Sequence, residues 1–329
     1  MISNSIDFTK FAISFDPRDK GRLFEYWEEI LSNQKWTEGK FTALFEERWA
    51  EWNGLQAVST SSWAGAAMAC MEYFQLSGKK VLCPTNTFMA TPLSIIKAGG
   101  EVVFGDCNRE DLCLSYEAVV SAAEREKVAA VWLVHIGGHI AFDTAKIADF
   151  CRSKGIVLLE DCAHAHGASW NKQKPGTWGN AGVYSFYATK SVTTGEGGML
   201  VSRDNGLIEF ARKYRNYGKF DYEVAGLNYR MSEFTAAVGV VQTDRMEEIT
   251  NWKNEVAERF LHPRFPKRLK LPEGMVSGFY KYIVFEPVEK STGKVYDQLC
   301  HSLLKREGDF PNSEWVSQNH WCVPLYYRP

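Results

Sequence analysis

At 329 residues, the chain exceeds the usual size of a single domain, which predicts one large domain and one smaller domain. Its 45% hydrophobic and 24% charged residues are typical of a folded globular protein and argue against a disordered chain. The formal net charge of -2 excludes a global basic field, so we expect no nucleic-acid partner.

The sequence predicts neither secretion nor a membrane span. The first 20 residues lack a basic segment followed by a long apolar one, so they do not resemble a signal peptide. No run of about 18 apolar residues occurs anywhere, so we expect no contact with a membrane. The eight cysteines are scattered through apolar segments without a C-x-x-C pair, which indicates buried, reduced thiols in a cytoplasmic protein.

Short β-rich runs alternate with helical patterns between about Ser61 and Asp204. This alternation predicts an α/β fold with a mostly parallel sheet, and the nearly continuous apolar runs suit strands that are covered on both faces. The predicted strands are VLC before Pro84, Glu101 to Asp106, Ala130 to Ile136, Ile156 to Asp161, Gly182 to Tyr187 and Gly198 to Ser202.

Helices are predicted between these strands. The segment FDTAKIADFCRSKG predicts a helix with Asp143 at its N-cap and Gly155 at its end. A second helix, rich in small residues, is predicted to begin at the pair Ser61 and Ser62 and to end at Gly78.

The pattern changes after about Thr250, where prolines interrupt the chain and YKYIVFEPV predicts an isolated strand. We place a domain boundary in the helix around Arg245 to Arg259. The expected domains are therefore a large one, residues 1–248, which includes an N-terminal helical segment, and a small C-terminal one, residues 249–329.

The segment LLEDCAHAHGASW, residues 158–170, concentrates reactive side chains behind an apolar strand. Its carboxylates, thiol and imidazoles are all possible metal ligands, but only HIGGH (His135 and His139) offers a second group of them. Asp161 ends the strand, where ligands bind in open parallel sheets. Taken alone, the segment fits a metal site, an acid/base site or a strand-end carboxylate with core histidines.

Lys190 lies in the segment SFYATKSVTTGEGGMLVS and changes the interpretation of residues 158–170. It directly follows an apolar strand and precedes a glycine cluster that allows close backbone packing. A lysine held in such a place loses its proton easily and can form a Schiff base with an aldehyde cofactor. Lys190 and Asp161, at two strand ends, are the two groups that pyridoxal 5'-phosphate needs, so we expect no metal.

Further segments can hold the rest of this cofactor. Its phosphate requires a helix N-terminus and hydroxyl groups, which Ser61, Ser62 and Trp63 at the start of the small-residue helix can supply, with Ser185 as a further candidate. Phe88 in TNTFMAT can stack on the ring. Each feature alone is also explained by an N-cap or by core packing.

The combination of SFxxxKxxxxGEGG, EDxAHAxGA and NYRMSE resembles the sugar aminotransferases of the DegT/DnrJ/EryC1/StrS type, a branch of the fold type I, aspartate-aminotransferase-like enzymes. The resemblance covers most of the chain. It implies a large domain with a mostly parallel seven-stranded sheet between helices and a smaller α+β C-terminal domain.

The resemblance also implies roles for individual residues. Lys190 would form the Schiff base and then move a proton between cofactor and substrate carbons, and Asp161 would keep the pyridine nitrogen protonated. His164 would lie beside the ring and its hydroxyl, Ser185 would bind the phosphate, and Phe88 would stack on the ring.

Asn228, in the motif NYRMSE, would reach the phosphate of a neighbouring subunit, which implies a homodimer. Arg215, Lys219 and Arg230 lie near the motifs and are candidates either for contact with an anionic diphosphate or for solvated surface charges.

The implied activity is transfer of an amino group from an amino acid, glutamate by analogy, to a keto group of a nucleotide-linked deoxysugar. An aminocyclitol aminotransferase and a non-catalytic sensor or structural protein that binds the cofactor remain alternatives. A sugar 3-dehydratase of the same family would carry histidine in place of Lys190, which argues against that branch.

Two features depart from the family pattern. The family usually has Ser-Gly-Thr where this chain has Ser61, Ser62 and Trp63, so a hydroxyl is lost and bulk is added at the phosphate helix. Relatives generally continue beyond the position of Pro329, so we expect the small domain either to be shortened or to continue in a longer chain.

Overall fold

The computed structural model describes residues 7–329. Residues 1–6, which form part of the segment expected to carry no signal peptide, lie outside the described residues. In the part described, no helix is long and apolar enough to cross a membrane.

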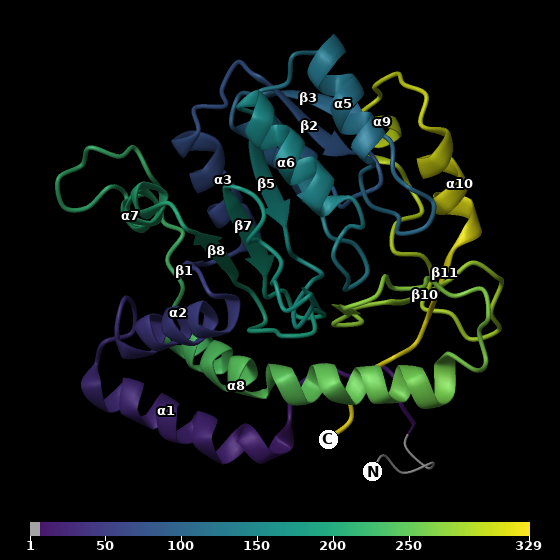
Figure 1. Cartoon of the computed structure of the whole chain (residues 1–329). Helices are drawn as coiled ribbons and strands as arrows, with labels where there is room; N and C mark the ends of the chain where they lie inside the picture. The colour runs from purple at the N-terminus through teal and green to yellow at the C-terminus, as the bar shows by residue number, and fades with distance from the viewer. Residues whose placement is uncertain (1–6) are drawn as a thin grey trace.

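Seven strands form the central sheet in the order β1-β8-β7-β5-β4-β2-β3 (Figure 1). Their bounds are β1 (Gln56–Thr60), β2 (Lys80–Pro84), β3 (Glu101–Gly105), β4 (Ala130–Val134), β5 (Val157–Asp161), β7 (Ala181–Ser185) and β8 (Gly198–Ser202). β8 pairs antiparallel with β1 and β7, and the other neighbouring pairs are parallel. The mostly parallel sheet is confirmed, whereas β1 was missed because its partner β8 lies far away in the sequence.

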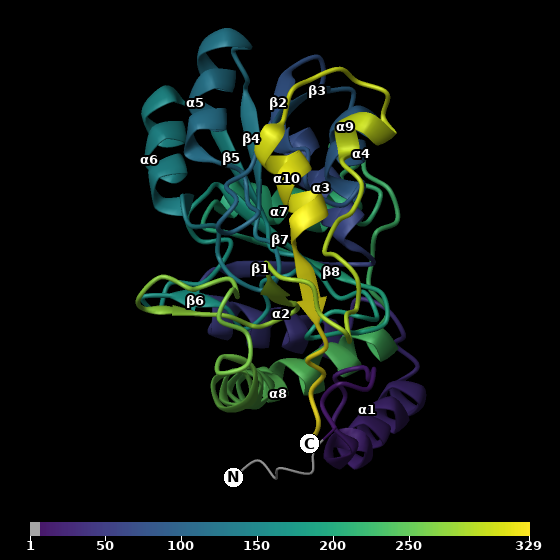
Figure 2. The same cartoon turned by 90° about the vertical axis from the view of Figure 1, so that its right-hand side faces the viewer.

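Helices cover both faces of the sheet (Figure 2). α5 and α6 pack on one face over Val131, Leu133 and Leu158, while α3, α4 and α7 pack on the other over Val58 and Leu159. The helices are α1 (Lys20–Asn33), α2 (Lys40–Asn53), α3 (Trp63–Tyr73), α4 (Ala90–Lys97), α5 (Tyr116–Arg125), α6 (Thr144–Lys154), α7 (Asn205–Tyr214), α8 (Glu233–Val256), α9 (Cys300–Leu303) and α10 (Pro311–Asn319), with a short 3-10 helix at Pro17–Asp19.

The predicted helix ends are largely confirmed. Gly155 terminates α6 with φ 65°, a conformation that favours glycine. Asp143 occupies the N-cap position of α6, but its carboxylate makes no capping bond and instead accepts from Asn108 and from the Tyr116 N–H. α3 begins after Ser62 as expected and ends at Tyr73, before Gly78.

The C-terminal part corrects one expectation. The segment YKYIVFEPV is not isolated, because β10 (Tyr282–Val284) pairs antiparallel with β11 (Trp321–Val323). Its partner lies near the end of the chain, beyond the range of a local pattern. A second small pair joins β6 (Ser169–Trp170) to β9 (Met275–Val276). α8 continues into a π-helix, Ala257–Leu261, and so crosses the expected boundary at residue 248 without a break.

Glu233, the last residue of the motif NYRMSE, joins α8 to the start of α2. Its buried carboxylate accepts from the N–H groups of Gly39, Phe41 and Thr42 at 2.9, 2.7 and 2.9 Å. A Cβ at Gly39 would lie 2.7 Å from Glu233 Oε2, so glycine permits this approach. The carboxylate thus satisfies free N–H groups at a helix N-terminus.

We expect Glu233→Ala to lower the free energy of unfolding by about 3 kcal/mol, because several N–H groups lose a charged acceptor. The matched control is Glu25→Ala on the exposed face of α1, which should change it by less than about 0.5 kcal/mol. Urea denaturation of both variants measures the difference. Equal stability of the two variants would contradict this role.

Candidate active site

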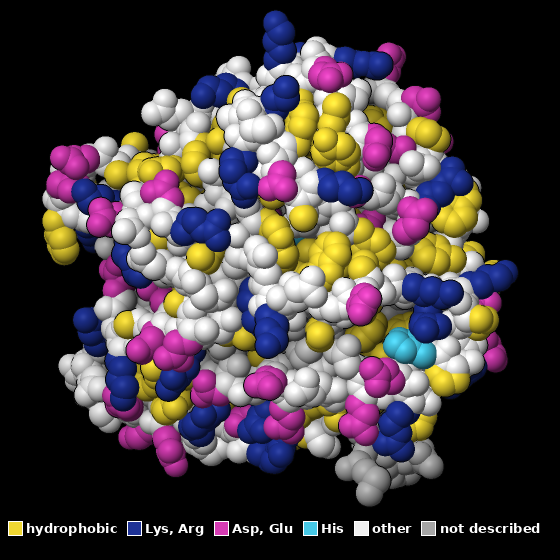
Figure 3. Space-filling model, in the orientation of Figure 1, with side chains coloured by type: hydrophobic (Ala, Val, Ile, Leu, Met, Phe, Trp, Pro, Cys, Tyr) yellow, Lys and Arg dark blue, Asp and Glu magenta, His cyan; other side chains and the backbone are white. Residues whose placement is uncertain are grey.

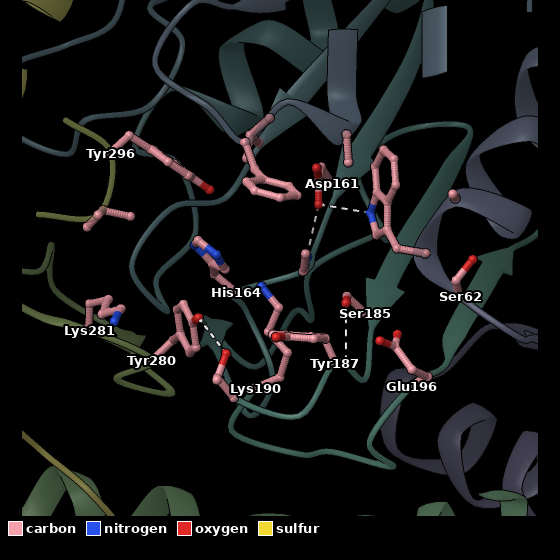
Figure 4. Close-up of a pocket in the computed structure, with 18 of the residues that line it drawn as sticks. Ser62, Asp161, His164, Ser185, Tyr187, Lys190, Glu196, Tyr280, Lys281 and Tyr296 are labelled. Atoms are coloured by element: carbon pink, nitrogen blue, oxygen red, sulfur yellow. Dashed lines mark hydrogen bonds between the residues drawn. The ribbon is translucent and has the colours of Figure 1, made fainter. Parts of the chain in front are cut away.

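A cavity of about 540 Å³ opens at the carboxyl ends of β4, β5 and β7. Val134, Asp161 and Ser185, the last residues of these three strands, all line it. Its other walls are the start of α3, the loop after β7 and segments of the C-terminal part. Figure 4 shows the side chains of Asp161, Ser185 and Lys190 around one space.

The carboxylate of Asp161 is buried and held from three sides. Its Oδ1 atom accepts from Trp63 Nε1 and from the Ala163 N–H, both at 3.0 Å, and its Oδ2 atom accepts from Thr91 Oγ1 at 3.0 Å. Burial raises the pKa of this carboxyl, whereas the bonds from Ala163 and Thr91 and the charge of Lys190 oppose the rise. These donors favour the ionised form, which is the form that can bind a protonated ring nitrogen.

Lys190 follows β7 and directs its amine into the cavity. Its Nζ atom lies 4.8 Å from the centre of the Tyr280 ring and donates no hydrogen bond to any residue of the range 7–329. Burial lowers the pKa of this amine from 10.5 to about 8; Asp161 opposes the lowering and Lys281 adds to it. Near neutral pH a fraction of the Lys190 amine is therefore unprotonated and can act as a nucleophile.

His164 is a neutral donor. Its Nδ1 atom accepts from the Gly137 N–H at 3.4 Å, which places the ring proton on Nε2. Burial, followed by the charge of Lys190, lowers the pKa of this imidazole well below its ordinary value. The ring packs at 4.3 Å from Tyr280 and at 6.0 Å from Tyr296, both from the C-terminal part.

The start of α3 lies at another wall of the cavity. Ser62 and Trp63 line it, and the N–H groups of this first turn provide an anion-binding end. Ser62 Oγ itself accepts from the Gly65 N–H at 3.3 Å, so its hydroxyl serves as the N-cap. Ser185 Oγ, at the end of β7, lines the same cavity.

Of three other expected site residues, one lines the cavity and two do not. Phe88 lines the cavity and is 65% exposed, so it is not a core residue. Ser61 does not line the cavity, and its N–H donates to the Tyr229 carbonyl at 2.7 Å. Asn228 is exposed and also lies outside the lining, with its Oδ1 atom accepting from the Arg230 N–H.

Residues 17–265 match the model of the DegT/DnrJ/EryC1/StrS aminotransferase family. The chain belongs to this family. It is 34% identical over 253 residues to a GDP-perosamine synthase of Vibrio cholerae, with 74% of this chain and 68% of the relative covered. It is 31% identical over 294 residues to a dTDP-4-dehydro-2,3,6-trideoxy-D-glucose 4-aminotransferase of Saccharopolyspora spinosa, with 82% and 74% covered.

The structure is similar to that of the aminotransferase TlmJ from Streptoalloteichus hindustanus. The TM-score is 0.83 at 29% sequence identity, and the alignment covers 92% of this chain and 90% of that one. The expected fold, that of a fold type I enzyme dependent on pyridoxal phosphate, is confirmed.

The cofactor of this aminotransferase is pyridoxal 5'-phosphate. The cavity fits it on three counts: a lysine amine without a hydrogen-bond partner in the described chain, a buried carboxylate with an acceptor position left, and a helix N-terminus beside a serine hydroxyl. Lys190 would hold the aldehyde carbon, Asp161 the ring nitrogen, and Ser62, Ser185 and the backbone N–H of Trp63 the phosphate.

Among residues 7–329, two buried groups of ligand-type side chains lie outside the cavity lining. They are Asp111, Cys113 and His139, and His135, Glu160 and Cys162. The Glu160 carboxylate already accepts from the N–H groups of Gly176, Trp178 and Gly179 at 2.7 to 2.8 Å, and it pairs with His135 Nε2 at 2.9 Å. These contacts assign Glu160 to holding the loop between β6 and β7.

Sequence reasoning missed the part of the site that comes from the C-terminal region. Tyr280, Lys281, Lys294 and Tyr296 all line the cavity, about 100 residues after Lys190. The only local signal is the aromatic and basic run YKY, which we interpreted as strand residues. Arg215 was a candidate for anion binding, but it is buried and pairs with Glu46 at 2.5 Å.

We expect the reaction of the cofactor-free aminotransferase with pyridoxal phosphate to accelerate as the pH rises through about 8, because only the neutral Lys190 amine attacks the aldehyde. The rise in visible absorbance measures the rate, and the same series with N-acetyl-lysine corrects for titration of the cofactor. Lys281→Met should move the midpoint upward because it removes a repelling charge. The exposed control Lys97→Met should leave it unchanged, and a wild-type midpoint near 10.5 would contradict the prediction.

Proposed function

We propose that this aminotransferase moves an amino group from an amino acid, which we take to be glutamate, to the keto group of a nucleotide-linked deoxysugar. The observation that carries the proposal is the convergence of Lys190 and Asp161 in one cavity at the strand ends. The named activity of the Saccharopolyspora relative on a dTDP-linked dehydro sugar supports the class of acceptor.

Each polar group would have a defined task. When bound, the cofactor supplies an electron sink for the carbon that carries the amino group. Lys190 would hold the cofactor and, once released by the substrate amine, would carry the proton between the reacting carbons. Asp161 would stabilise positive charge at the ring nitrogen. His164 would donate from Nε2 toward the ring hydroxyl without adding a charge.

Two lysines of the C-terminal part favour anionic substrates. Lys281 and Lys294 line the cavity together with Lys190. Lys294 donates to the carbonyl groups of Gln318 and His320 at 2.8 and 2.6 Å, which fixes its position. Both the amino-acid carboxylate and the diphosphate of a nucleotide sugar carry the negative charge that such a wall attracts.

We expect 15N-glutamate and a panel of nucleotide-linked ketosugars to give a 15N-labelled amino sugar, detected by product mass. Lys190→Ala should reduce this turnover by about 10³-fold, because it removes both the covalent anchor and the proton carrier. The exposed control Lys97→Ala should keep the wild-type turnover. Treating the wild type with a chelator should also leave its turnover unchanged.

Other outcomes would contradict the proposal in distinct ways. Amination of an aminocyclitol ketone but of no sugar nucleotide would reject the proposed acceptor. Cofactor binding to Lys190 without any reaction with amino acids would reject transamination and support a sensor.

We also propose that the working unit is a homodimer in which Asn228 reaches the phosphate site of the partner. Asn228 is exposed and does not line the cavity of its own chain. The segment before it, residues 217–227, projects from the body of the protein (Figure 1). Phe220, Tyr222 and Leu227 of this segment are 88, 67 and 55% exposed. Hydrophobic side chains are visible at that edge of the molecule (Figure 3), and a second copy would cover them.

A mixing experiment tests this arrangement. Lys190→Ala and Asn228→Ala are each expected to have low turnover alone. Mixed dimers should regain turnover, because one of their two sites then combines an intact Lys190 with an intact Asn228 from the partner. If Asn228 serves its own chain, no site is intact and mixing restores nothing.

The free thiols support a cytoplasmic location as part of this proposal. All eight cysteines are buried and unpaired within the described chain. Thiols persist in a reducing compartment, which is also where amino-acid donors and nucleotide sugars are held.

A further inference from the structure

The indole of Trp63 reaches Asp161 rather than the phosphate wall. Trp63 is the first residue of α3, and its side chain is only 6% exposed. Its Nε1–H donates to Asp161 Oδ1 at 3.0 Å across 98 residues of sequence. The large side chain at this position therefore has a specific polar contact with the carboxylate expected to face the cofactor.

A count of acceptor positions shows what this contact does. A carboxylate has about four lone-pair positions, two on each oxygen. On Oδ1, the Trp63 indole and the Ala163 N–H take both positions. On Oδ2, Thr91 Oγ1 takes one. One position on Oδ2 therefore remains for a further donor.

The indole of Trp63 lies beside a second buried indole. Its ring lies 5.3 Å from that of Trp132, which is fully buried on β4. The Nε1 atom of Trp132 has no hydrogen-bond partner among the residues described. Trp63 and Trp132 are thus neighbouring buried indoles, and of the two only Trp63 donates a hydrogen bond to Asp161.

We propose that Trp63 is a positioning residue: its indole N–H fixes the Asp161 carboxylate so that Oδ2 faces the ring nitrogen of the cofactor. The inference rests on the proposed role of Asp161 as partner of that nitrogen. Without the indole donor, Oδ1 regains a free acceptor position, and two donors, the Ala163 N–H and Thr91 Oγ1, hold the carboxylate instead of three. The ring nitrogen would then be protonated less completely, and the cofactor would be a weaker electron sink.

The test compares Trp63→Phe with the matched control Trp132→Phe, since both replace a buried indole by a phenyl ring. Each variant is loaded with pyridoxal phosphate labelled with 15N in the ring, and the nitrogen chemical shift is followed against pH. In Trp63→Phe the pKa of the ring nitrogen should fall, and kcat with glutamate should drop about ten-fold with little change in KM. Trp132→Phe should match the wild type in all three quantities.

A second measurement covers the case in which Trp63→Phe does not fold. In cofactor-free protein labelled with 15N-tryptophan, Asp161→Asn should shift the indole N–H signal of Trp63 and leave that of Trp132 in place. An unchanged Trp63 signal would overturn the proposal, as would a ring-nitrogen pKa in Trp63→Phe equal to that of the wild type.

The outcomes separate this inference from the proposed function. If the wild type forms no bond between Lys190 and the cofactor, the proposed function fails first. If the wild type turns over normally and Trp63→Phe behaves like Trp132→Phe, only the positioning role of Trp63 fails.

Discussion

The site depends on one constraint, the burial of a carboxyl group at the end of β5. Asp161 is 5% exposed, and a charge in such a place is tolerated only when donors surround it. Three segments far apart in sequence supply them: the start of α3 through Trp63, α4 through Thr91, and the turn after β5 through Ala163. The charge of Lys190 also favours the ionised form of this carboxyl. These partners also determine which acceptor position stays available for the cofactor.

The sheet brings these groups together. β5 lies between β4 and β7, with Val134 and Val183 as the register partners of Asp161. Because these three strands are parallel, their carboxyl ends open on the same edge. The loop that follows β7 then carries Lys190 into the space beside Asp161. Six of the seven strands, and the meeting of these two residues, could be predicted because each depends on a local apolar run and on this general rule.

The other features of the site could not be predicted, because they depend on contacts between residues far apart in the sequence. A tryptophan at position 63 was interpreted as a loss at the phosphate site, since no local pattern shows that its indole reaches a carboxylate 98 residues later. Arg215 was assigned to the surface or to an anion, whereas the structure pairs it with Glu46. Tyr280 and Lys281 enter the cavity from a region whose pairing of β10 with β11 spans about 40 residues. Side-chain partners across such distances follow from packing and not from periodicity.

The central claim is that Lys190 is the one lysine that bonds to the cofactor, and chemical trapping tests it most directly. The wild-type protein is loaded with pyridoxal phosphate, reduced with borohydride, digested, and mapped by peptide mass. We predict a single modified site, on the peptide that contains Lys190, although Lys281 and Lys294 line the same cavity. Modification of either of those lysines in its place, or no stable modification at all, would contradict the account.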